Sequence, residues 1–337
     1  MRFATRVNNC ADGELLLLSR DGVRGMPMGA RWPTLLHAIT QWDALMDDAA
    51  ALSVTLEAGG GDTIDYGGLL APLPRTWQWL DGSAFANHGA LMQKAFNHPP
   101  IETDLPLMYQ GMSHQFLASH ENVALPTEAD LIDFEGEFAI VTDDVPMGCS
   151  AVDAMDHIRL ILLINDWSLR AVAPAEMKTG FGWIQAKPAC SAAPIAITPD
   201  ELGDRWRNGR VCLPLRVAVN GAWFGHPSGE GMDYGFHDLI AHAARTRQLC
   251  AGTIIGSGTV SDPDFERVGS TCISERRAIE MITQGKPVTP FLQFGDHVRM
   301  TAGTDVSLFG EISQIVTAFR ADFDRYESAR VSKSVIL

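Results

Sequence analysis

Residues 132–141 alternate apolar side chains with acidic ones, and this segment constrains the fold more than any other part of the chain. A repeat of two residues is typical of a β-strand, whose successive side chains point to opposite faces. The strand would place the carboxylates of Asp133, Glu135 and Glu137 on one face. Glu135 and Glu137 would then be same-face neighbours, and like charges held so close repel one another unless a cation with oxygen ligands neutralises them. The segment therefore predicts either a metal site or a half-buried strand that shows its polar face to water.

Two neighbouring features favour the metal site. Gly136 removes side-chain bulk between Phe134 and Phe138 in the apolar row. Asp166 lies in a polar break, Asn165-Asp166-Trp167-Ser168, directly after the apolar run of residues 160–164. An acid at the mouth of a buried segment is a better candidate ligand than one on an open surface. Asp166 is therefore the candidate for a further ligand.

The overall composition excludes several classes of protein. With 337 residues, of which 46% are hydrophobic and 20% charged, the chain can bury a substantial core. Its net charge of -15 argues against a nucleic-acid-binding protein, because no basic stripe is present to neutralise phosphates. The six cysteines include no C-x-x-C pair, which favours a reducing compartment over a disulfide framework or a zinc site. We expect no secretory signal and no membrane span, and hence a cytoplasmic protein.

The chain is predicted to form two domains of unequal size. The first, residues 1–72, is a small α+β unit whose expected elements are a strand at 14–19, a helix within 32–56 and a strand at 63–70. A connector, Ala71-Pro72-Leu73-Pro74-Arg75, follows and is rigid because proline fixes φ. The second domain, residues 73–337, becomes mostly β from Val211 onward. We therefore expect an α+β fold with a mainly β second domain.

The second domain contains further polar residues whose role the pattern leaves open. Asp81 precedes a predicted helix at residues 83–96, where an acid often caps the free N–H groups. His88 lies about two turns along the chain from it, and a lone helical histidine is more often structural than catalytic. Lys187 lies among apolar residues, either as a ligand-binding cation or as a snorkelling side chain. A predicted strand over residues 253–260 runs into small residues, which admit a ligand close to the backbone or merely form a turn.

Together these segments resemble the fumarylacetoacetate hydrolase family over most of the chain. The motifs that carry the resemblance occur in the family's order: the connector at 69–75, Asp81 with His88 seven residues later, Glu135-x-Glu137, Asn165-Asp166-Trp167-Ser168-x-Arg170, Lys187, and Ser257-Gly258-Thr259. The resemblance implies a second domain built as a distorted β-sandwich or roll. It also implies a homodimer, in keeping with the prevalence of twofold assemblies.

The resemblance further implies an acidic metal site. Its ligands would be Asp81, Glu135, Glu137 and Asp166, and the ion would be Mg²⁺ or Ca²⁺, with Mn²⁺ as a further option. Ligation by oxygen alone suits these hard cations and argues against zinc. In such a site Asp81 is a ligand rather than a helix cap, and Lys187 is a site residue rather than a snorkelling one.

The reaction implied by the resemblance is hydrolysis of a carbon–carbon bond in a 1,3-dicarbonyl acid. The substrate would be a small anion, fumarylacetoacetate or a related acylpyruvate from the breakdown of aromatic compounds. His88 would act as the general base, and Glu275 would orient its ring. Lys187 and Arg170 would hold the leaving enolate or a substrate carboxylate. The residues that bind substrate would be Arg170, Tyr109, Thr259 and Lys187.

Two departures from the family pattern concern the substrate. Ser83 stands where fumarylacetoacetases have a tyrosine, and Ala173 stands where they have a glutamine. Both changes remove polar contacts, so the acid cleaved need not be fumarylacetoacetate itself. Decarboxylation of a 2-oxo acid or hydration of a 2-oxo-enoic acid on the same scaffold is the alternative reaction. A non-catalytic metal-binding or scaffold protein is disfavoured because the whole set of site residues is present.

Overall fold

A mixed β-sheet connects the two parts of the molecule. Within the residues that the computed structural model describes, 1–96, 103–303 and 308–320, this sheet has twelve strands. Its main path has the order β4-β3-β2-β1-β14-β11-β10-β19-β5-β6, and β13 pairs with β11 and with β7 beside that path. A second, five-stranded sheet has the order β18-β17-β20-β21-β8. The predicted α+β class, with a small N-terminal part and a larger sheet-rich part, is confirmed.

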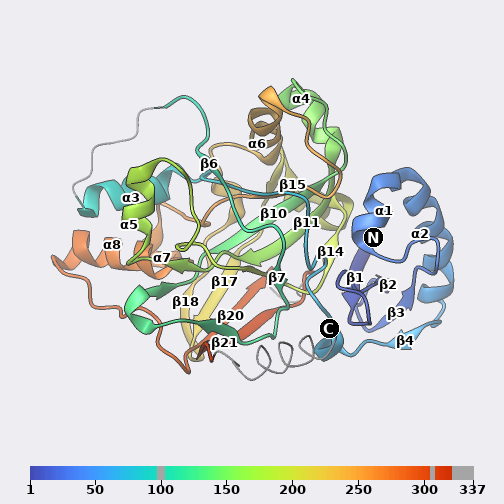
Figure 1. The fold of residues 1–337 in the computed structure, drawn as a ribbon, viewed down its shortest axis with the longest axis horizontal. Coiled ribbons are helices and arrows are strands. Elements are labelled where there is room, and N and C mark those ends of the chain that lie inside the picture. Colours follow the sequence, from blue (N-terminus) through green and yellow to red (C-terminus); the bar gives the residue numbers. More distant parts are fainter. Residues whose placement is uncertain (97–102, 304–307, 321–337) are drawn as a thin grey trace, which may run out of the picture.

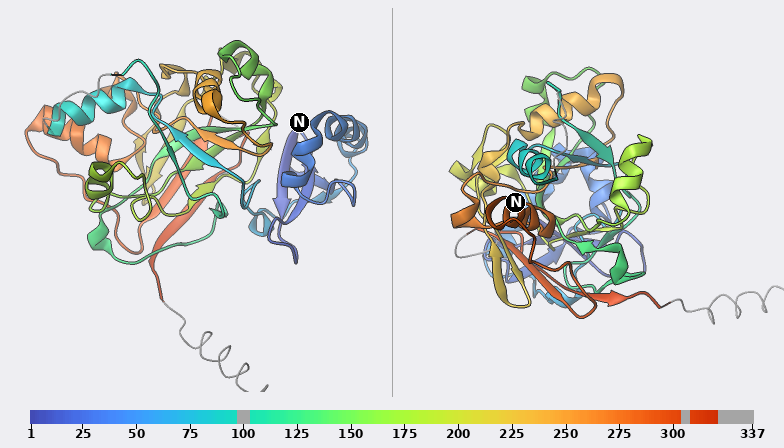
Figure 2. Two further views of the ribbon diagram at one scale, coloured as in Figure 1. Left: turned by 45° about the horizontal axis from the view of Figure 1, so that its top comes forward. Right: turned by 90° about the vertical axis from the view of Figure 1, so that its left-hand side faces the viewer.

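The N-terminal part forms a lobe at one end of the molecule, drawn in blue (Figure 1, Figure 2). Its elements are β1 (Arg2–Arg6), β2 (Glu14–Leu18), β3 (Arg24–Pro27), α1 (Leu35–Ala38), α2 (Trp42–Glu57) and β4 (Asp62–Thr63). Leu15 and Leu17 share one face of β2 and pack with Leu45 and Ala49 of α2 in a single buried cluster. The predicted helix within 32–56 is therefore present, although it is divided into two. A domain boundary at residue 72 stays a prediction.

The predicted strand at residues 63–70 is wrong in extent. The extended part ends at Thr63, and Tyr66–Gly68 form a short 3-10 turn instead. The Asp65 side chain accepts a hydrogen bond from the Gly67 N–H at 3.0 Å. Such a local bond from an aspartate to the backbone two residues on favours a turn over a strand.

The strand β10 (Gly136–Thr142) lies at the centre of the larger part, between β11 (Ile158–Asn165) and β19 (Ile254–Gly256). All seven of its residues are buried. Phe138 and Ile140 pack into one hydrophobic cluster, whereas Ala139 and Val141 pack into another on the opposite face. A solvated polar face, which was the alternative interpretation of this segment, is therefore wrong, because both faces of the sheet are covered.

The acidic segment is also not one regular strand. A short strand, β9 (Ile132–Asp133), pairs with β12 (Ser168–Leu169). The strand is then interrupted at Phe134 and Glu135 before β10 begins. The apolar residues that alternate with the acids still pack in one hydrophobic cluster, and Arg170 binds both Asp133 and Glu135. That all three carboxylates share one face stays a prediction.

Asp81 lies in a strand rather than beside a helix. β5 (Trp79–Gly82) pairs in parallel with β19 and antiparallel with β6 (Met108–Gln110), which holds Asp81 extended and buried. The helix α3 (Ala86–Phe96) begins three residues later than predicted. The helix-cap interpretation of Asp81 is accordingly wrong.

The remaining elements cover the sheets and connect them. Helices are α4 (Ala151–Ala154), α5 (Ala173–Thr179), α6 (Phe236–Ala243), α7 (Phe265–Val268) and α8 (Ile273–Gln284). Strands are β7 (Phe116–Leu117), β8 (Val123–Leu125), β13 (Cys190–Ala192), β14 (Ala196–Ile197), β15 (Trp206–Arg207), β16 (Arg210–Val211), β17 (Leu215–Val219), β18 (Ala222–Gly225), β20 (His297–Ala302) and β21 (Ile312–Ala318). In the described parts of the chain, no helix has the length and apolar character needed to cross a membrane.

Candidate metal centre

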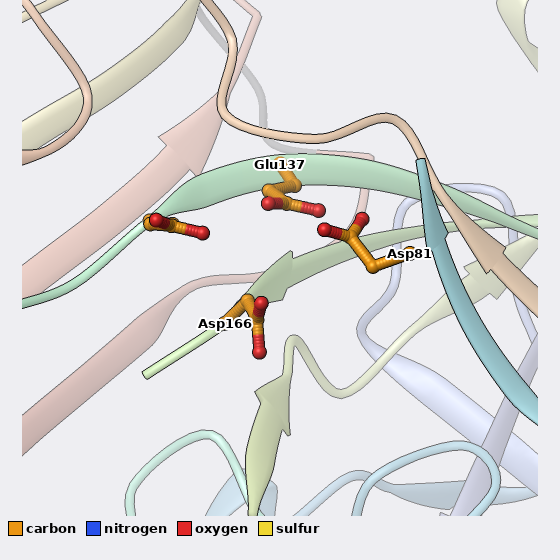
Figure 3. A group of neighbouring side chains, drawn as sticks. Asp81, Glu137 and Asp166 are labelled. Atoms are coloured by element: carbon orange, nitrogen blue, oxygen red, sulfur yellow. The ribbon is translucent and has the colours of Figure 1, made fainter. Parts of the chain in front are cut away.

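Four buried carboxylates converge in the larger part of the molecule. Asp81, Glu135, Glu137 and Asp166 each offer an oxygen, and these oxygens all lie within 4.8 Å of one another. Figure 3 shows Asp81, Glu137 and Asp166 reaching one shared space from separate segments of the chain. The four residues predicted as metal ligands are therefore brought together, although 85 residues of sequence separate Asp81 from Asp166.

The order of the strands explains how Asp81 and Glu137 meet. β19 lies between β10, which carries Glu137, and β5, which carries Asp81. The residue of β19 that pairs with Asp81 is Gly256. A Cβ atom at Gly256 would contact the Asp81 carboxylate and would lie 2.9 Å from Oε2 of Glu137. The missing side chain is therefore what lets acids from the two outer strands approach each other across the middle one.

Backbone hydrogen bonds hold the other two acids side by side. Gly136 pairs with Asn165, so the segments just before β10 and just after β11 run together. The Asp166 N–H donates to the Glu135 carbonyl at 2.9 Å, and the Glu135 N–H donates to Oδ1 of Asn165 at 3.0 Å. These bonds fix both backbones, and hence the origin of both carboxylates.

Two cations neutralise one side of the cluster. Lys187 Nζ donates to Oε2 of Glu135 at 2.7 Å and to Oδ2 of Asp166 at 2.6 Å. Arg170 Nη2 donates to the second oxygen of Glu135 at 2.6 Å. Burial alone would raise the pKa of Glu135, but Lys187 and Arg170 outweigh it and lower that pKa. Burial alone would lower the pKa of Lys187, but the charges of Asp166 and Glu135 outweigh it and raise that pKa.

The other side of the cluster lacks such partners. Both carboxylate oxygens of Glu137 are buried and accept no hydrogen bond from any described residue. Asp81 Oδ1 accepts one bond, from the Gly258 N–H at 3.1 Å. Burial and then the charge of Asp166 raise the pKa of Asp81 to about 8, and burial and then the charge of Asp81 raise that of Glu137 well above its ordinary value. Without a cation, a proton on one of these acids is what relieves their repulsion.

These observations fit a divalent metal ion. Buried carboxylates without partners are costly, and a hard dication satisfies several oxygens at once. The donor set consists of oxygens from Asp81, Glu135, Glu137 and Asp166, which suits Mg²⁺, Ca²⁺ or Mn²⁺ better than zinc. The identity of the ion stays a prediction.

A histidine–glutamate pair lies next to the acidic cluster. His88 of α3 and Glu275 of α8 are joined by Nδ1 and Oε2 at 2.7 Å. Glu275 is fully buried, whereas the His88 side chain keeps 19% of its surface exposed. The charge of His88 also lowers the pKa of Glu135, although burial, Lys187 and Arg170 have larger effects on it. That His88 and the acidic cluster act on one substrate stays a prediction.

The predicted substrate-binding residues lie around the same cluster. Arg170 binds Glu135 and also Asp133, whose Oδ2 accepts from Arg170 Nε at 2.8 Å. The Tyr109 hydroxyl donates to Oδ2 of Asp166, and Lys187 Nζ lies 5.4 Å from the centre of the tyrosine ring. Thr259 is buried directly after Gly258. Arg170 and Tyr109 thus contact acids of the cluster, while their role towards substrate stays a prediction.

Three residues at the centre were not among the predicted site residues. Gly256 lies against the carboxylates of Asp81 and Glu137, and Asp133 binds Arg170. Cys190 Sγ donates to Oδ1 of Asp166 at 3.1 Å. Gly256 lies in the run of small residues at 253–260. That run indicates that another group can approach the backbone closely, but it does not indicate which group. No spacing in the sequence links Cys190 to Asp166, because their contact depends on the pairing of β13 with the end of β11.

Family models account for nearly all of the described chain. Residues 78–317 match the model of the fumarylacetoacetate (FAA) hydrolase C-terminal region, and residues 1–75 match that of fumarylacetoacetase N-terminal domain 2. Among curated proteins, the mitochondrial oxaloacetate tautomerase Fahd2a of Rattus norvegicus is 25% identical over 157 residues. That match covers 46% of this chain and 48% of the relative, so the chain spans about half the length of this relative.

Solved structures with the same fold cover the chain more completely. Maleylpyruvate hydrolase from Sphingobium sp. SYK-6, in complex with manganese(II) ion and pyruvate, has a TM-score of 0.63 at 17% identity. Fumarylacetoacetate hydrolase from Exiguobacterium antarcticum has a TM-score of 0.64 at 16% identity. Each covers 95% of this chain and 100% of its own. With its fold shared and its two family models spanning residues 1–75 and 78–317, this chain belongs to the fumarylacetoacetate hydrolase family.

Proposed function

We propose that this protein is a metal-dependent hydrolase that cleaves a carbon–carbon bond in a small 1,3-dicarbonyl acid, such as fumarylacetoacetate or a related acylpyruvate. The observation that carries the proposal is the His88–Glu275 pair beside four converging carboxylates. Hydrolysis needs a water molecule to be deprotonated, and a histidine held by a buried acid is suited to that task. The similar fold of a maleylpyruvate hydrolase solved with manganese(II) and pyruvate supports a divalent metal and a 2-oxo acid as ligands.

The metal would be held by Asp81, Glu135, Glu137 and Asp166, and when bound it supplies a Lewis acid that polarises the dicarbonyl oxygens. Side chains of the protein itself hold two of these acids, Glu135 and Asp166, beforehand. Lys187 and Arg170 hold Glu135 from two sides, and Tyr109, Cys190 and Lys187 hold Asp166. Glu137 is left without a competing hydrogen bond, so its oxygens are free for a cation.

His88 would accept and return the proton in this reaction. Its Nδ1 is engaged by Glu275, which leaves Nε2 to accept a proton from water, and the Glu275 carboxylate stabilises the imidazolium that forms. The water oxygen bonds to the carbonyl carbon, the bond from that carbon to its neighbour breaks, and the electron pair leaves as an enolate. His88 then returns the proton to the enolate carbon, so that one water molecule is added across the broken bond.

The cations around the acidic cluster would neutralise negative charge on the substrate. Lys187 keeps its positive charge because the acids beside it raise its pKa, and it would stabilise the leaving enolate. Arg170 uses Nε and Nη2 on Asp133 and Glu135, so any contact with a substrate carboxylate would have to come from Nη1. Thr259 would contribute its hydroxyl and backbone to the carboxylate pocket.

The proposal is tested with a panel of 2,4-dioxo acids, whose absorbance is lost when the bond is cleaved. Wild type should cleave at least one of them with Mg²⁺ or Mn²⁺ and stop when the metal is chelated. His88→Ala should bind metal as wild type does yet lose hydrolysis by roughly 10²–10⁴-fold. His120→Ala, at an exposed histidine, serves as the matched control and should keep full activity. Unchanged turnover in His88→Ala would remove the general-base role.

A second candidate function is tautomerisation of a 2-oxo acid, which the name of the curated rat relative favours. His88 would then carry a proton between carbon and enol oxygen, and no bond between carbons would break. Product analysis separates the two: the hydrolase releases two acids from a dioxo acid, whereas the tautomerase only speeds the loss of the enol signal of oxaloacetate. Decarboxylation or hydration would be recognised in the same analysis by CO₂ release or by water addition without cleavage.

A further inference from the structure

Asp133 is a fully buried carboxylate with four hydrogen-bond donors around it. Its Oδ1 accepts from its neighbour Phe134 N–H at 2.8 Å and from Ile273 N–H at 2.7 Å. Its Oδ2 accepts from Ser274 N–H at 2.9 Å and from Arg170 Nε at 2.8 Å. The carboxylate is therefore saturated and has no oxygen to spare for a metal or a substrate.

Arg170 connects Asp133 to the metal centre. The guanidinium of Arg170 is planar, so fixing Nε on Asp133 also fixes the direction of Nη2. That second nitrogen donates to Oε1 of Glu135 at 2.6 Å. Asp133 thus holds the arginine that holds a candidate metal ligand.

The first turn of α8 connects Asp133 to the His88–Glu275 pair. Ile273 and Ser274 are the first two residues of α8, and Glu275 is the third. A carboxylate that accepts both of those N–H groups fixes the first turn of the helix and with it the origin of the Glu275 side chain. Asp133 therefore also holds the segment that orients His88.

We propose that Asp133 is a positioning residue that fixes the His88–Glu275 pair relative to the metal centre, through Arg170 on one side and the first turn of α8 on the other. This inference rests on the proposed function, because it assumes that both groups act on one substrate. A carboxylate that served only to stabilise the end of a helix would not need the arginine, and its loss would affect unfolding alone. The two roles therefore make different predictions.

The test uses Asp133→Asn, which keeps the size of the side chain but removes its charge and one acceptor. Metal-free protein is titrated with Mn²⁺ by calorimetry, and turnover is measured at saturating Mn²⁺. We expect roughly 10- to 100-fold weaker Mn²⁺ binding and a comparable loss of kcat, as for other residues that orient ligands. In an Arg170→Gln background, Asp133→Asn should no longer weaken Mn²⁺ binding, because its effect on the metal centre acts through Arg170. In a His88→Ala background, Asp133→Asn should no longer lower kcat, because its effect on turnover acts through His88.

Glu280→Gln is the matched control. Glu280 is also a nearly buried acid on α8, and it accepts the N–H groups of Val288 and Thr289 at 2.6 and 2.9 Å, away from the metal centre. It should unfold at a lower temperature yet keep the Mn²⁺ affinity and kcat of wild type. If Asp133→Asn behaves like Glu280→Gln, or if its losses are the same in the two mutant backgrounds as in wild type, the inference is overturned.

Arg170→Lys provides an independent test should Asp133→Asn not fold. Lysine keeps the charge but cannot bind Asp133 and Glu135 with one fixed fork, so both Mn²⁺ affinity and kcat should fall roughly tenfold or more. Wild-type values in Arg170→Lys would contradict the inference. If wild type binds Mn²⁺ but cleaves no substrate, the proposed function fails while the Mn²⁺ titrations still decide the role of Asp133. If wild type binds no Mn²⁺, both fail.

Discussion

Gly256 pairs directly with Asp81 across the parallel strands β19 and β5. The same glycine faces the carboxylate of Glu137, which belongs to the strand on its other side. Two acids that bulkier residues would keep apart are thereby brought to one point. The position of the acidic cluster depends on this gap in the middle strand as much as on the acids themselves.

Gly256→Ala should therefore disrupt the metal centre although no ligand is replaced. The added methyl group would contact both carboxylates and the Trp79 ring. We expect the protein to be destabilised by about 1–3 kcal/mol and Mn²⁺ binding to weaken by roughly tenfold or more. Thermal unfolding and calorimetry measure the two effects. Gly68→Ala is the control, because a Cβ there would lie 3.6 Å from its nearest neighbour, an ordinary contact. Equal Mn²⁺ affinity in the two variants would show that the gap has no role in metal binding.

The metal-free protein should lose stability as the pH rises. Burial and the charge of Asp166 raise the pKa of folded Asp81 from 3.8 to about 8, so between about pH 4 and pH 8 the folded state keeps a proton that the unfolded state releases. Stability then falls with increasing pH across that window, which is the opposite of the usual behaviour of a salt-bridged carboxylate. With Mn²⁺ bound the fall should be absent, since the ion replaces the proton, and the stabilisation by Mn²⁺ should grow with pH.

Thermal unfolding at pH 5, 6, 7 and 8, with chelator and with Mn²⁺, measures this difference. A change of 1 kcal/mol corresponds to about 2–4 °C for a chain of moderate size, which is readily resolved. A metal-free protein whose unfolding temperature rises steadily from pH 5 to pH 8 would mean that Asp81 and Glu137 are ionised in the absence of a cation.

Tyr109→Phe should weaken the metal centre rather than only the binding of substrate. The Tyr109 hydroxyl donates to Asp166, and burial followed by the charge of Asp166 raises its pKa well above the ordinary value, so it remains a donor at neutral pH. A hydrogen bond to a charged group contributes about 1.5–3 kcal/mol, so Mn²⁺ affinity should fall roughly tenfold. If KM rises while Mn²⁺ affinity is unchanged, Tyr109 serves the substrate alone, as the family resemblance implied.

Much of the centre could be predicted because its chemistry lies in short motifs. Glu135-x-Glu137 and Asn165-Asp166 mark the ends of two strands that pair with each other, so their meeting follows from local pattern. The family resemblance added Asp81, for which the local pattern suggested a helix cap. That suggestion failed because β5 forms only by pairing with β19 and β6, which lie far away in sequence.

The parts that could not be predicted depend on register and on breaks in strands. Asp133 shares the alternation of Glu135 and Glu137, yet its carboxylate accepts the N–H groups of Ile273 and Ser274 at the start of α8. Arg170 binds both Asp133 and Glu135, which depends on the pairing of β9 with β12. No periodicity in a single sequence reports where a strand is interrupted, so these relationships appeared only with the fold.

The most direct test of the metal centre is a crystal of the protein grown with Mn²⁺ and measured at the manganese absorption edge. We predict one strong anomalous peak, surrounded by oxygens of Asp81, Glu135, Glu137 and Asp166 at about 2.1–2.3 Å. Anomalous density that lies elsewhere, or its absence from among these four side chains at saturating Mn²⁺, would contradict the account.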